Sequence, residues 1–248
     1  MRPARRLVPL VTALAVALPL AACGEDSPTP ATPTPTPTSS AMTTSAPTPS
    51  PADGPAQRRL TATEVTAALP GKDEGPYPPD DREVDPTQRS TAVTDPESCL
   101  ALELDTPEMR TFKKEHMVAG GGQIYLQPQD FAAPQMSVIL WSHDEVYPKR
   151  FFDEAGAALA ECTTYATADA PDDTMGDDWQ ATSIPTPAMG DQSFGVRIGR
   201  EQFDMAVDYL WVRSGRNLIS VRMRTGYTQS NDKRLAKYAQ GVLDELAR

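Results

Sequence analysis

Residues 203–224, FDMAVDYLWVRSGRNLISVRMR, decide the fold that this sequence predicts. In the second half of the stretch, apolar and polar residues alternate strictly: Ile219, Val221 and Met223 with Ser220, Arg222 and Arg224. A period of two predicts a β-strand with one face in the core and the other polar. We therefore predict two antiparallel strands, 203–213 and 217–224, with Ser214-Gly215 in the turn of a hairpin.

More strands are predicted upstream of this hairpin. They cover residues 90–93, 99–104, 123–127, 135–143, 179–184 and 194–198. The strand at 135–143 contains Val138-Ile139-Leu140-Trp141, which is apolar on both faces and is expected in the interior of a sheet. Gly120-Gly121-Gly122 is expected to break the chain before it, and residues 72–86, rich in Pro and Asp, are expected to form a loop.

Three helices are predicted around these strands. The first begins at Thr61, because Thr61 and Glu64 have the spacing of a capping box and Leu60 and Val65 that of a hydrophobic staple. The second begins near Pro148 and the third is C-terminal. Their apolar faces are Phe152, Ala155, Leu159 and Cys162 in the second and Leu235, Ala239, Val242 and Leu246 in the third. A short helix opening at Thr106-Pro107-Glu108 would turn Met109 and Phe112 inward.

Runs of strands between a few helices predict a single α+β domain over residues 57–248, a mainly antiparallel sheet with about three packed helices. These residues suffice for one domain with a substantial core. The sequence shows no second linker and no internal repeat.

Residues 1–22 have the parts of an export signal. Arg2, Arg5 and Arg6 are basic, and an uncharged apolar run follows from Leu7 to Leu20. The run is shorter than the roughly 20 residues that a membrane-spanning helix needs.

The signal ends in Leu20-Ala21-Ala22-Cys23, which resembles the lipobox of bacterial lipoproteins. The resemblance implies cleavage before Cys23 and attachment of a diacylglyceryl group to its sulfur. The protein would then be a palmitate-type lipoprotein on the outer face of the cell membrane. The alternative is an ordinary cleaved signal in which Cys23 is incidental.

Residues 23–56 are predicted to be a lipidated cysteine followed by a disordered linker. Of residues 24–56, 22 of 33 are Pro, Thr or Ser, so almost no apolar surface is available to offset the entropy of ordering. Proline favours extended polyproline II, and at about 3.1 Å per residue the linker would reach on the order of 100 Å. Its Thr/Pro tracts are also compatible with O-glycosylation.

The charge balance argues against some partners. The chain has 23 basic and 34 acidic residues. Loss of Arg2, Arg5 and Arg6 with the signal leaves 20 basic residues and a net charge of −14. Such acidity argues against nucleic acid as a partner and against adhesion of the domain to anionic lipid.

Two cysteines, Cys99 and Cys162, follow Cys23 in the sequence. A pair of cysteines in an exported domain predicts a disulfide. Free thiols, or a metal site shared with His116 and His143, are the alternatives, although the spacing matches no metal motif that we recognise.

No catalytic motif is found. Gly190 to Gly195 approaches a nucleophile elbow but lacks the G-x-S-x-G spacing and precedes a predicted strand. The acidic loop from Asp169 to Asp178 lacks the order of an EF-hand, so a solvated loop is favoured over a calcium site. His116 and His143 have no visible partners, and no spacing indicates a carboxylate pair. No cofactor is expected.

One set of side chains is a candidate ligand-binding face. Its members are Arg197, Trp211, Arg213, Arg222 and Arg224. If their strands are neighbours, several guanidinium groups would lie beside an aromatic ring, which suits a carboxylate or phosphate joined to a sugar or apolar group. The alternative is the solvent side of a half-buried sheet, with these arginines paired to nearby carboxylates.

Several motifs together resemble the extracellular sensor domain of PknH-type actinobacterial receptor kinases and the lipoproteins that share it. The matching residues are Leu60-Thr61 with Glu64-Val65, Pro96-Glu97-Ser98-Cys99, Phe151 to Cys162, Trp179, and Val212 to Ile219. The resemblance covers about residues 58–246 and implies one α+β domain with a ligand cleft. The family usually has a second disulfide around the late hairpin, whereas no cysteine lies near Met205 or Met223 here.

The leading hypothesis is a non-enzymatic, lipid-anchored cell-surface protein that binds or senses an envelope small molecule or an exported protein. The first alternative is an envelope hydrolase, which would show two convergent, perturbed carboxylates in a cleft. The second is an accessory lipoprotein that binds exported proteins, which would show a large exposed apolar patch.

Overall fold

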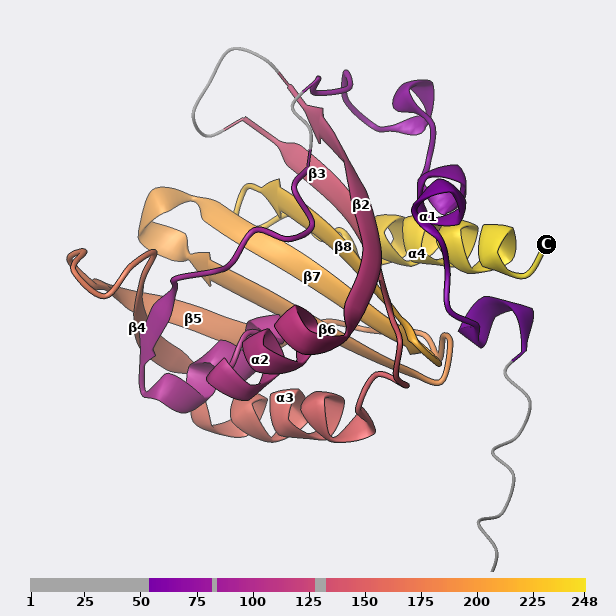
Figure 1. The fold of residues 1–248 in the computed structure, drawn as a ribbon. Coiled ribbons are helices and arrows are strands. Elements are labelled where there is room, and N and C mark those ends of the chain that lie inside the picture. Colours follow the sequence, from indigo (N-terminus) through magenta and orange to yellow (C-terminus); the bar gives the residue numbers. More distant parts are fainter. Residues whose placement is uncertain (1–53, 82–83, 128–132) are drawn as a thin grey trace, which may run out of the picture. The chain divides into compact units, whose positions relative to one another are not determined.

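A computed structural model of the protein describes residues 54–81, 84–127 and 133–248. The predicted signal peptide, Cys23 and the linker as far as Asp53 lie outside the described residues. The described part is an α+β fold, as predicted, with one antiparallel sheet of eight strands in the order β1-β4-β5-β6-β7-β8-β3-β2 (Figure 1). The strands are β1 Val93–Asp95, β2 Met117–Leu126, β3 Gln135–His143, β4 Thr164–Ala168, β5 Gly176–Ser183, β6 Gln192–Arg200, β7 Met205–Ser214 and β8 Asn217–Thr225.

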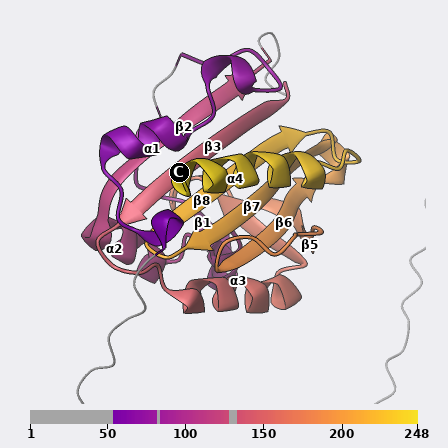
Figure 2. The same ribbon diagram turned by 90° about the vertical axis from the view of Figure 1, so that its right-hand side faces the viewer.

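Helices cover both faces of the sheet. The α-helices are α1 Ala62–Ala68, α2 Pro107–His116, α3 Lys149–Glu161 and α4 Asp232–Leu246. The 3-10 helices are η1 Pro55–Gln57, η2 Lys72–Glu74, η3 Glu97–Glu103 and η4 Glu201–Phe203. We call the face under α1 and α4 the α4 face, and the face under η3, α2 and α3 the α3 face (Figures 1 and 2).

The late hairpin, β7 and β8, lies in the middle of the sheet. Leu210 pairs with Val221 and Ser214 with Asn217, so the two-residue turn is Gly215-Arg216, one residue later than predicted. Gly215 has a φ of +57°, which glycine adopts without strain. The pairing register between strands, and not composition alone, decides which side chains lie on the same face of the sheet.

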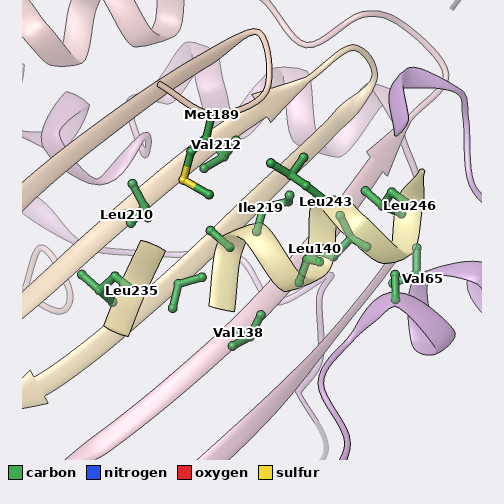
Figure 3. Packing of buried hydrophobic residues seen from close by; sticks show 14 of the residues in the cluster. Val65, Val138, Leu140, Met189, Leu210, Val212, Ile219, Leu235, Leu243 and Leu246 are labelled. Carbon is green, nitrogen blue, oxygen red and sulfur yellow. The ribbon is translucent and has the colours of Figure 1, made fainter. Parts of the chain in front are cut away.

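The α4 face is an apolar core. Helix α4 buries Leu235, Ala239, Val242 and Leu246, as its spacing predicts (Figure 3). Beneath it lie the apolar residues of three neighbouring strands, Val138 and Leu140 of β3, Leu210 and Val212 of β7, and Ile219, Val221 and Met223 of β8. Helix α1 adds Val65 and begins with the predicted capping box, in which the Thr61 hydroxyl accepts from the Glu64 N–H and the Glu64 carboxylate accepts from the Thr61 N–H.

The α3 face is held by the predicted disulfide. Cys99 of η3 and Cys162, at the end of α3, are bonded, with 5.6 Å between their Cα atoms. Phe152 and Ala155 face the sheet, and the short helix α2 forms with Met109 buried and Phe112 packed inward, as predicted. The second core therefore joins η3, α2 and α3 to the α3 face of β3, β6, β7 and β8.

Local structure near the edges of the sheet differs from the prediction at three places. Residues 99–103 belong to the 3-10 helix η3, which Leu104 caps, and do not form a strand. Cys99 to Leu102 are all buried, and a short, wholly apolar run has no period that tells a strand from a helix. Strand β1 begins at Val93, where the predicted strand ended. Strand β4 was missed altogether, since only Tyr165 and Ala168 of its five residues are buried.

The glycine run was also misread. Gly120, Gly121 and Gly122 lie inside β2 and do not break it. A Cβ on Gly120 would lie 2.6 Å from Pro86, and one on Gly122 would lie 2.9 Å from Val84. The glycines therefore allow close approach of other chain segments to the strand, which is the second meaning of glycine in a sheet.

Candidate ligand-binding cleft

The register brings together four of the five residues predicted for a ligand face. Arg222 is opposite Tyr209, and Arg224 is opposite Val207. Opposite residues share a face, so Arg222 and Arg224 lie on the α3 face with Trp211 and Arg213, which are two and four residues after Tyr209. The strands β6, β7 and β8 are neighbours, as the prediction required.

Arg197 lies on the other face, so the expectation that it joins this group was wrong. It pairs across β6 and β7 with Asp208, which is in phase with Leu210 on the α4 face. Arg197 donates from Nε and Nη2 to the Asp208 carboxylate at 2.6 and 2.8 Å, and from Nη1 to the Tyr227 carbonyl at 3.0 Å. Asn231, just before α4, also donates to Asp208 at 2.9 Å, so this cluster joins the sheet to α4.

Of the four residues that share the α3 face, Trp211 and Arg222 line one hollow there. Arg213 lies near the hairpin turn, where its Nη1 is 3.7 Å from an Asp191 carboxylate oxygen. Arg224 donates to the Ala133 carbonyl at 3.2 Å. The predicted group is thus spread along the face, and its middle part forms the site.

The hollow at Trp211, which we call the inner hollow, has a volume of about 230 Å³. Its floor comes from β3, β7 and β8, and η3 and the segment before β1 supply the rest of its wall. Its lining residues are Ser90, Glu103, Asp105, Ser137, Ile139, Trp141, Tyr209, Trp211, Ser220 and Arg222. Three aromatic rings form a row in it, with centroids 6.2 Å apart between Trp141 and Trp211 and between Trp211 and Tyr209.

Two polar atoms in this lining are buried without a hydrogen-bond partner in the described structure. They are Nε1 of Trp211 and Oγ of Ser137, in side chains of residues that are 7% and 2% exposed. A buried polar group without a partner costs about 1–3 kcal/mol. Such groups are retained where water or a ligand satisfies them, so these two atoms make the inner hollow a candidate binding position.

The electrostatics of the hollow depend on Glu103, which is partly buried. Burial raises the pKa of its carboxyl, and the Tyr209 hydroxyl, which donates to it at 2.7 Å, and the positive charge of Arg222 oppose the rise. The pKa of Tyr209 is raised well above its usual value by burial and by Glu103. The hydroxyl therefore stays protonated and holds Glu103 in place.

The two carboxylates of the cleft have different partners. Asp105 also lines the hollow and pairs with Arg110 at 2.7 Å. Glu103 accepts a hydrogen bond from the Tyr209 hydroxyl, and burial raises its pKa. A hydrolase of the expected kind would need two convergent carboxyl groups free to act as acid and base, whereas Asp105 is held in an ion pair.

The two histidines have partners that the sequence did not reveal. His116, at the end of α2, lies 3.0 Å from Asp144 through Nδ1. His143 of β3 is buried, bonded through Nδ1 to the Arg216 carbonyl at 2.9 Å, and burial lowers its pKa to about 4. Ser193, the serine of the segment that approaches a nucleophile elbow, donates its hydroxyl to the Pro187 carbonyl at 2.8 Å and to neither histidine.

In the part of the chain that the structure describes, no three His, Cys, Asp or Glu side chains converge as a metal site requires. Within the same ranges, no helix has both the length and the apolar character to cross a bilayer.

Sequence reasoning missed Glu103, Tyr209, Trp141 and Ser137 as site residues. Tyr209 has the same phase as Trp211, so the alternation along β7 contained that signal. Glu103 ends an apolar run that was misread as a strand, and nothing in the sequence indicates that η3 lies over the sheet.

The described residues form an antiparallel sheet with helices on both faces and a cleft on the α3 face. The chain is similar to the crystal structure of the extracellular domain of PknH from Mycobacterium tuberculosis, with a TM-score of 0.55, 12% identity, and coverage of 77% of this chain and 98% of that chain. The expected resemblance to a PknH-type sensor domain is thereby confirmed at the level of the fold.

Another match is to an uncharacterised protein, the Rv0999 ortholog of Mycobacterium smegmatis, with a TM-score of 0.35, 10% identity and the same coverage of 77% and 98%. No protein-family model matches the chain. No curated protein matches it either.

Proposed function

We propose that this protein is a non-enzymatic, lipid-anchored binding or sensor-like protein of the cell envelope, and that its α3 face holds a small envelope molecule. One observation carries the proposal: Trp211 Nε1 and Ser137 Oγ are buried, unpartnered in the described structure, and line one hollow. The likeness of the fold to a kinase's extracellular domain is in keeping with a place outside the cell.

The anchor is proposed from the sequence. Cys23 follows Leu20-Ala21-Ala22, and the Pro/Thr-rich segment after it would hold the domain away from the membrane. Two or more acyl chains give stable anchoring at about 0.8 kcal/mol for each buried CH₂. A Cys23→Ser variant should appear in the soluble fraction or as uncleaved precursor, and the unchanged protein should gain the mass of a diacylglyceryl group. Cys23→Ser protein that has lost residues 1–22 and still remains in the membrane fraction would contradict the anchor.

A flat protein-binding surface is less well supported. The large apolar residues exposed in the described chain are Val118 in β2, Val146 before α3 and Phe203 in η4. Single exposed apolar residues on separate elements are ordinary and do not form the contiguous patch that an accessory lipoprotein would present.

Native mass spectrometry of the protein purified gently from its own envelope tests the binding function. The expected spectrum contains a reproducible adduct that is lost on denaturation. Ser137→Leu should abolish the adduct, because the larger side chain fills the inner hollow.

The matched control is Gly241→Leu, in the groove of about 670 Å³ between α1 and α4, where a Cβ meets nothing within 4 Å. This variant should keep the adduct. No adduct on the wild-type protein, or an adduct that survives Ser137→Leu in a folded protein, would contradict the proposal.

A further inference from the structure

A second hollow adjoins the inner hollow on the α3 face. This outer hollow has a volume of about 520 Å³ and lies between α2 and residues 87–90. Its lining residues are Thr87, Gln88, Arg89, Ser90, Asp105, Arg110, Thr111, Lys113, Lys114 and Met117. Ser90 and Asp105 belong to both hollows.

The outer hollow is basic, although the chain as a whole has a formal net charge of −11. Four of its lining residues are cationic, whereas Asp105 is the one carboxylate among them. Arg110 pairs with Asp105 at 2.7 Å and also donates to the Ala92 carbonyl at 2.7 Å. One cation is therefore neutralised by this ion pair, and Arg89, Lys113 and Lys114 lie outside it, with Lys113 also attracted electrostatically by Asp105 and Asp85.

These three cations are not used by the fold as ion-pair partners. Arg89 and Lys114 are exposed and form no ion pair with a described residue. Lys113 lies 4.9 Å from the ring centroid of Trp141, which lines the inner hollow. The two exposed cations, Arg89 and Lys114, with Lys113 beside them, suit the two charges of a phosphate, which lysine and arginine recognise.

The two hollows meet. A hollow of about 150 Å³ between them is lined by Arg110 and Lys113, which reach the outer hollow, and by Trp141 and Trp211, which reach the inner one. A molecule that occupies both would have an anion next to α2 and a body against the aromatic row. Trp211 Nε1 would donate to an oxygen of that body, and Ser137 Oγ would bond to a second polar atom.

We infer that the cleft takes a phosphorylated ring compound, with the phosphate in the outer hollow and a polar ring, a sugar or a nucleobase, in the inner hollow. The inference rests on the proposed function and names the class of its ligand. Aromatic side chains bind either kind of ring, and the ring would be placed by the Trp211 and Ser137 hydrogen bonds.

The indole N–H resonances of ¹⁵N-labelled protein test this inference. The chain has 3 Trp, so the spectrum has three such signals, and Trp211→Phe identifies one of them. The probes are glucose 1-phosphate and uridine monophosphate, with glucose, uridine and inorganic phosphate as their parts. A phosphorylated probe should move the Trp211 signal and bind at least tenfold more tightly than either of its parts, and the better of the two identifies the ring.

Variants of exposed residues locate the phosphate. Arg89→Gln and Lys114→Gln should each weaken the phosphorylated probe about three- to tenfold, and Lys233→Gln on α4, an exposed lysine on the other face, should not. The inference is overturned if neither phosphorylated probe binds, if glucose or uridine binds as tightly, or if a probe binds without moving the Trp211 signal.

A different result would overturn the proposed binding function itself. That result is a native mass spectrum without an adduct, or with an adduct that Ser137→Leu does not remove. An uncharged adduct that is lost in Ser137→Leu would support the binding function. It would overturn only the inference that the ligand is phosphorylated.

Discussion

Replacement of Arg197 by Met should destabilise the protein strongly and leave ligand binding unchanged. The Asp208 carboxylate is 1% exposed and accepts three hydrogen bonds, two from Arg197 at 2.6 and 2.8 Å and one from Asn231 at 2.9 Å. Arg197→Met removes the cation and two of these bonds but keeps an unbranched side chain of comparable length. Removing one partner of a buried pair typically costs about 3–5 kcal/mol, because the other charge stays buried.

The converse variant, Asp208→Leu, should cost less, about 2–3 kcal/mol, because a charged hydrogen-bonding group is lost but Arg197 keeps some access to solvent. The Arg197 side chain is 18% exposed and retains its bond to the Tyr227 carbonyl. The double variant should be less destabilised than the sum of the single ones by about 2 kcal/mol or more, as expected for coupled neighbours. A loss of 3 kcal/mol corresponds to a fall in Tm of roughly 6–12 °C in a domain of this size.

Urea denaturation followed by circular dichroism measures these free energies of unfolding. The native-mass-spectrometry adduct is the second measurement, and Arg197→Met should retain it at a temperature where the variant is folded. The reasoning would be refuted by a cost below about 1 kcal/mol for Arg197→Met or by additive single variants, since either would mean that the pair is not coupled. Loss of the adduct in folded Arg197→Met would restore Arg197 to the ligand site.

Other predictions concern the disulfide, the glycines and pH. Replacing Cys99 and Cys162 together by Ala should lower the free energy of unfolding by about 4 kcal/mol in the chain-entropy model, because the two cysteines are 63 residues apart. An unchanged free energy of unfolding in a urea titration would mean that the disulfide does not stabilise the fold. Gly122→Ala should destabilise the protein by about 1–3 kcal/mol, because the added Cβ crowds Val84. Gly156→Ala in α3 has open space around its Cβ and should stabilise the protein by about 0.5–1 kcal/mol. Equal changes in Tm for the two variants would contradict this difference. The pKa of His143 is about 4 in the folded state and 6.5 when the group is unperturbed, so the unfolded state binds the proton first as the pH falls. About 3 kcal/mol of stability should therefore be lost between pH 6.5 and pH 4. Urea titrations across this pH range should give His143→Gln a shallower loss than wild type; an identical slope would argue against a neutral buried His143.

The sequence predicted the central sheet better than its margins. The alternation in β8 and the helical spacing in α4 report burial on one face, and both elements were correctly placed. The capping residues of α1 are local in sequence and were equally informative. The disulfide was predicted from the number and compartment of the cysteines, which requires no geometry.

The site could be predicted only in part, because pairing between strands is a long-range property. Trp211 and Arg222 were assigned to one face correctly, since each follows the alternation of its own strand. Arg197 was assigned to the wrong face because the register of β6 against β7 places it opposite Asp208. The wall formed by η3, including Glu103, depends on packing that no local pattern in residues 97–103 encodes.

A crystal structure of the gently purified protein, in the form that shows the native-mass adduct, would show whether a ligand occupies the α3 face. We expect continuous non-protein density there, with an acceptor within hydrogen-bond distance of Trp211 Nε1 and a polar atom beside Ser137 Oγ. Density for the adduct in the groove between α1 and α4, with the inner hollow holding only water, would contradict it.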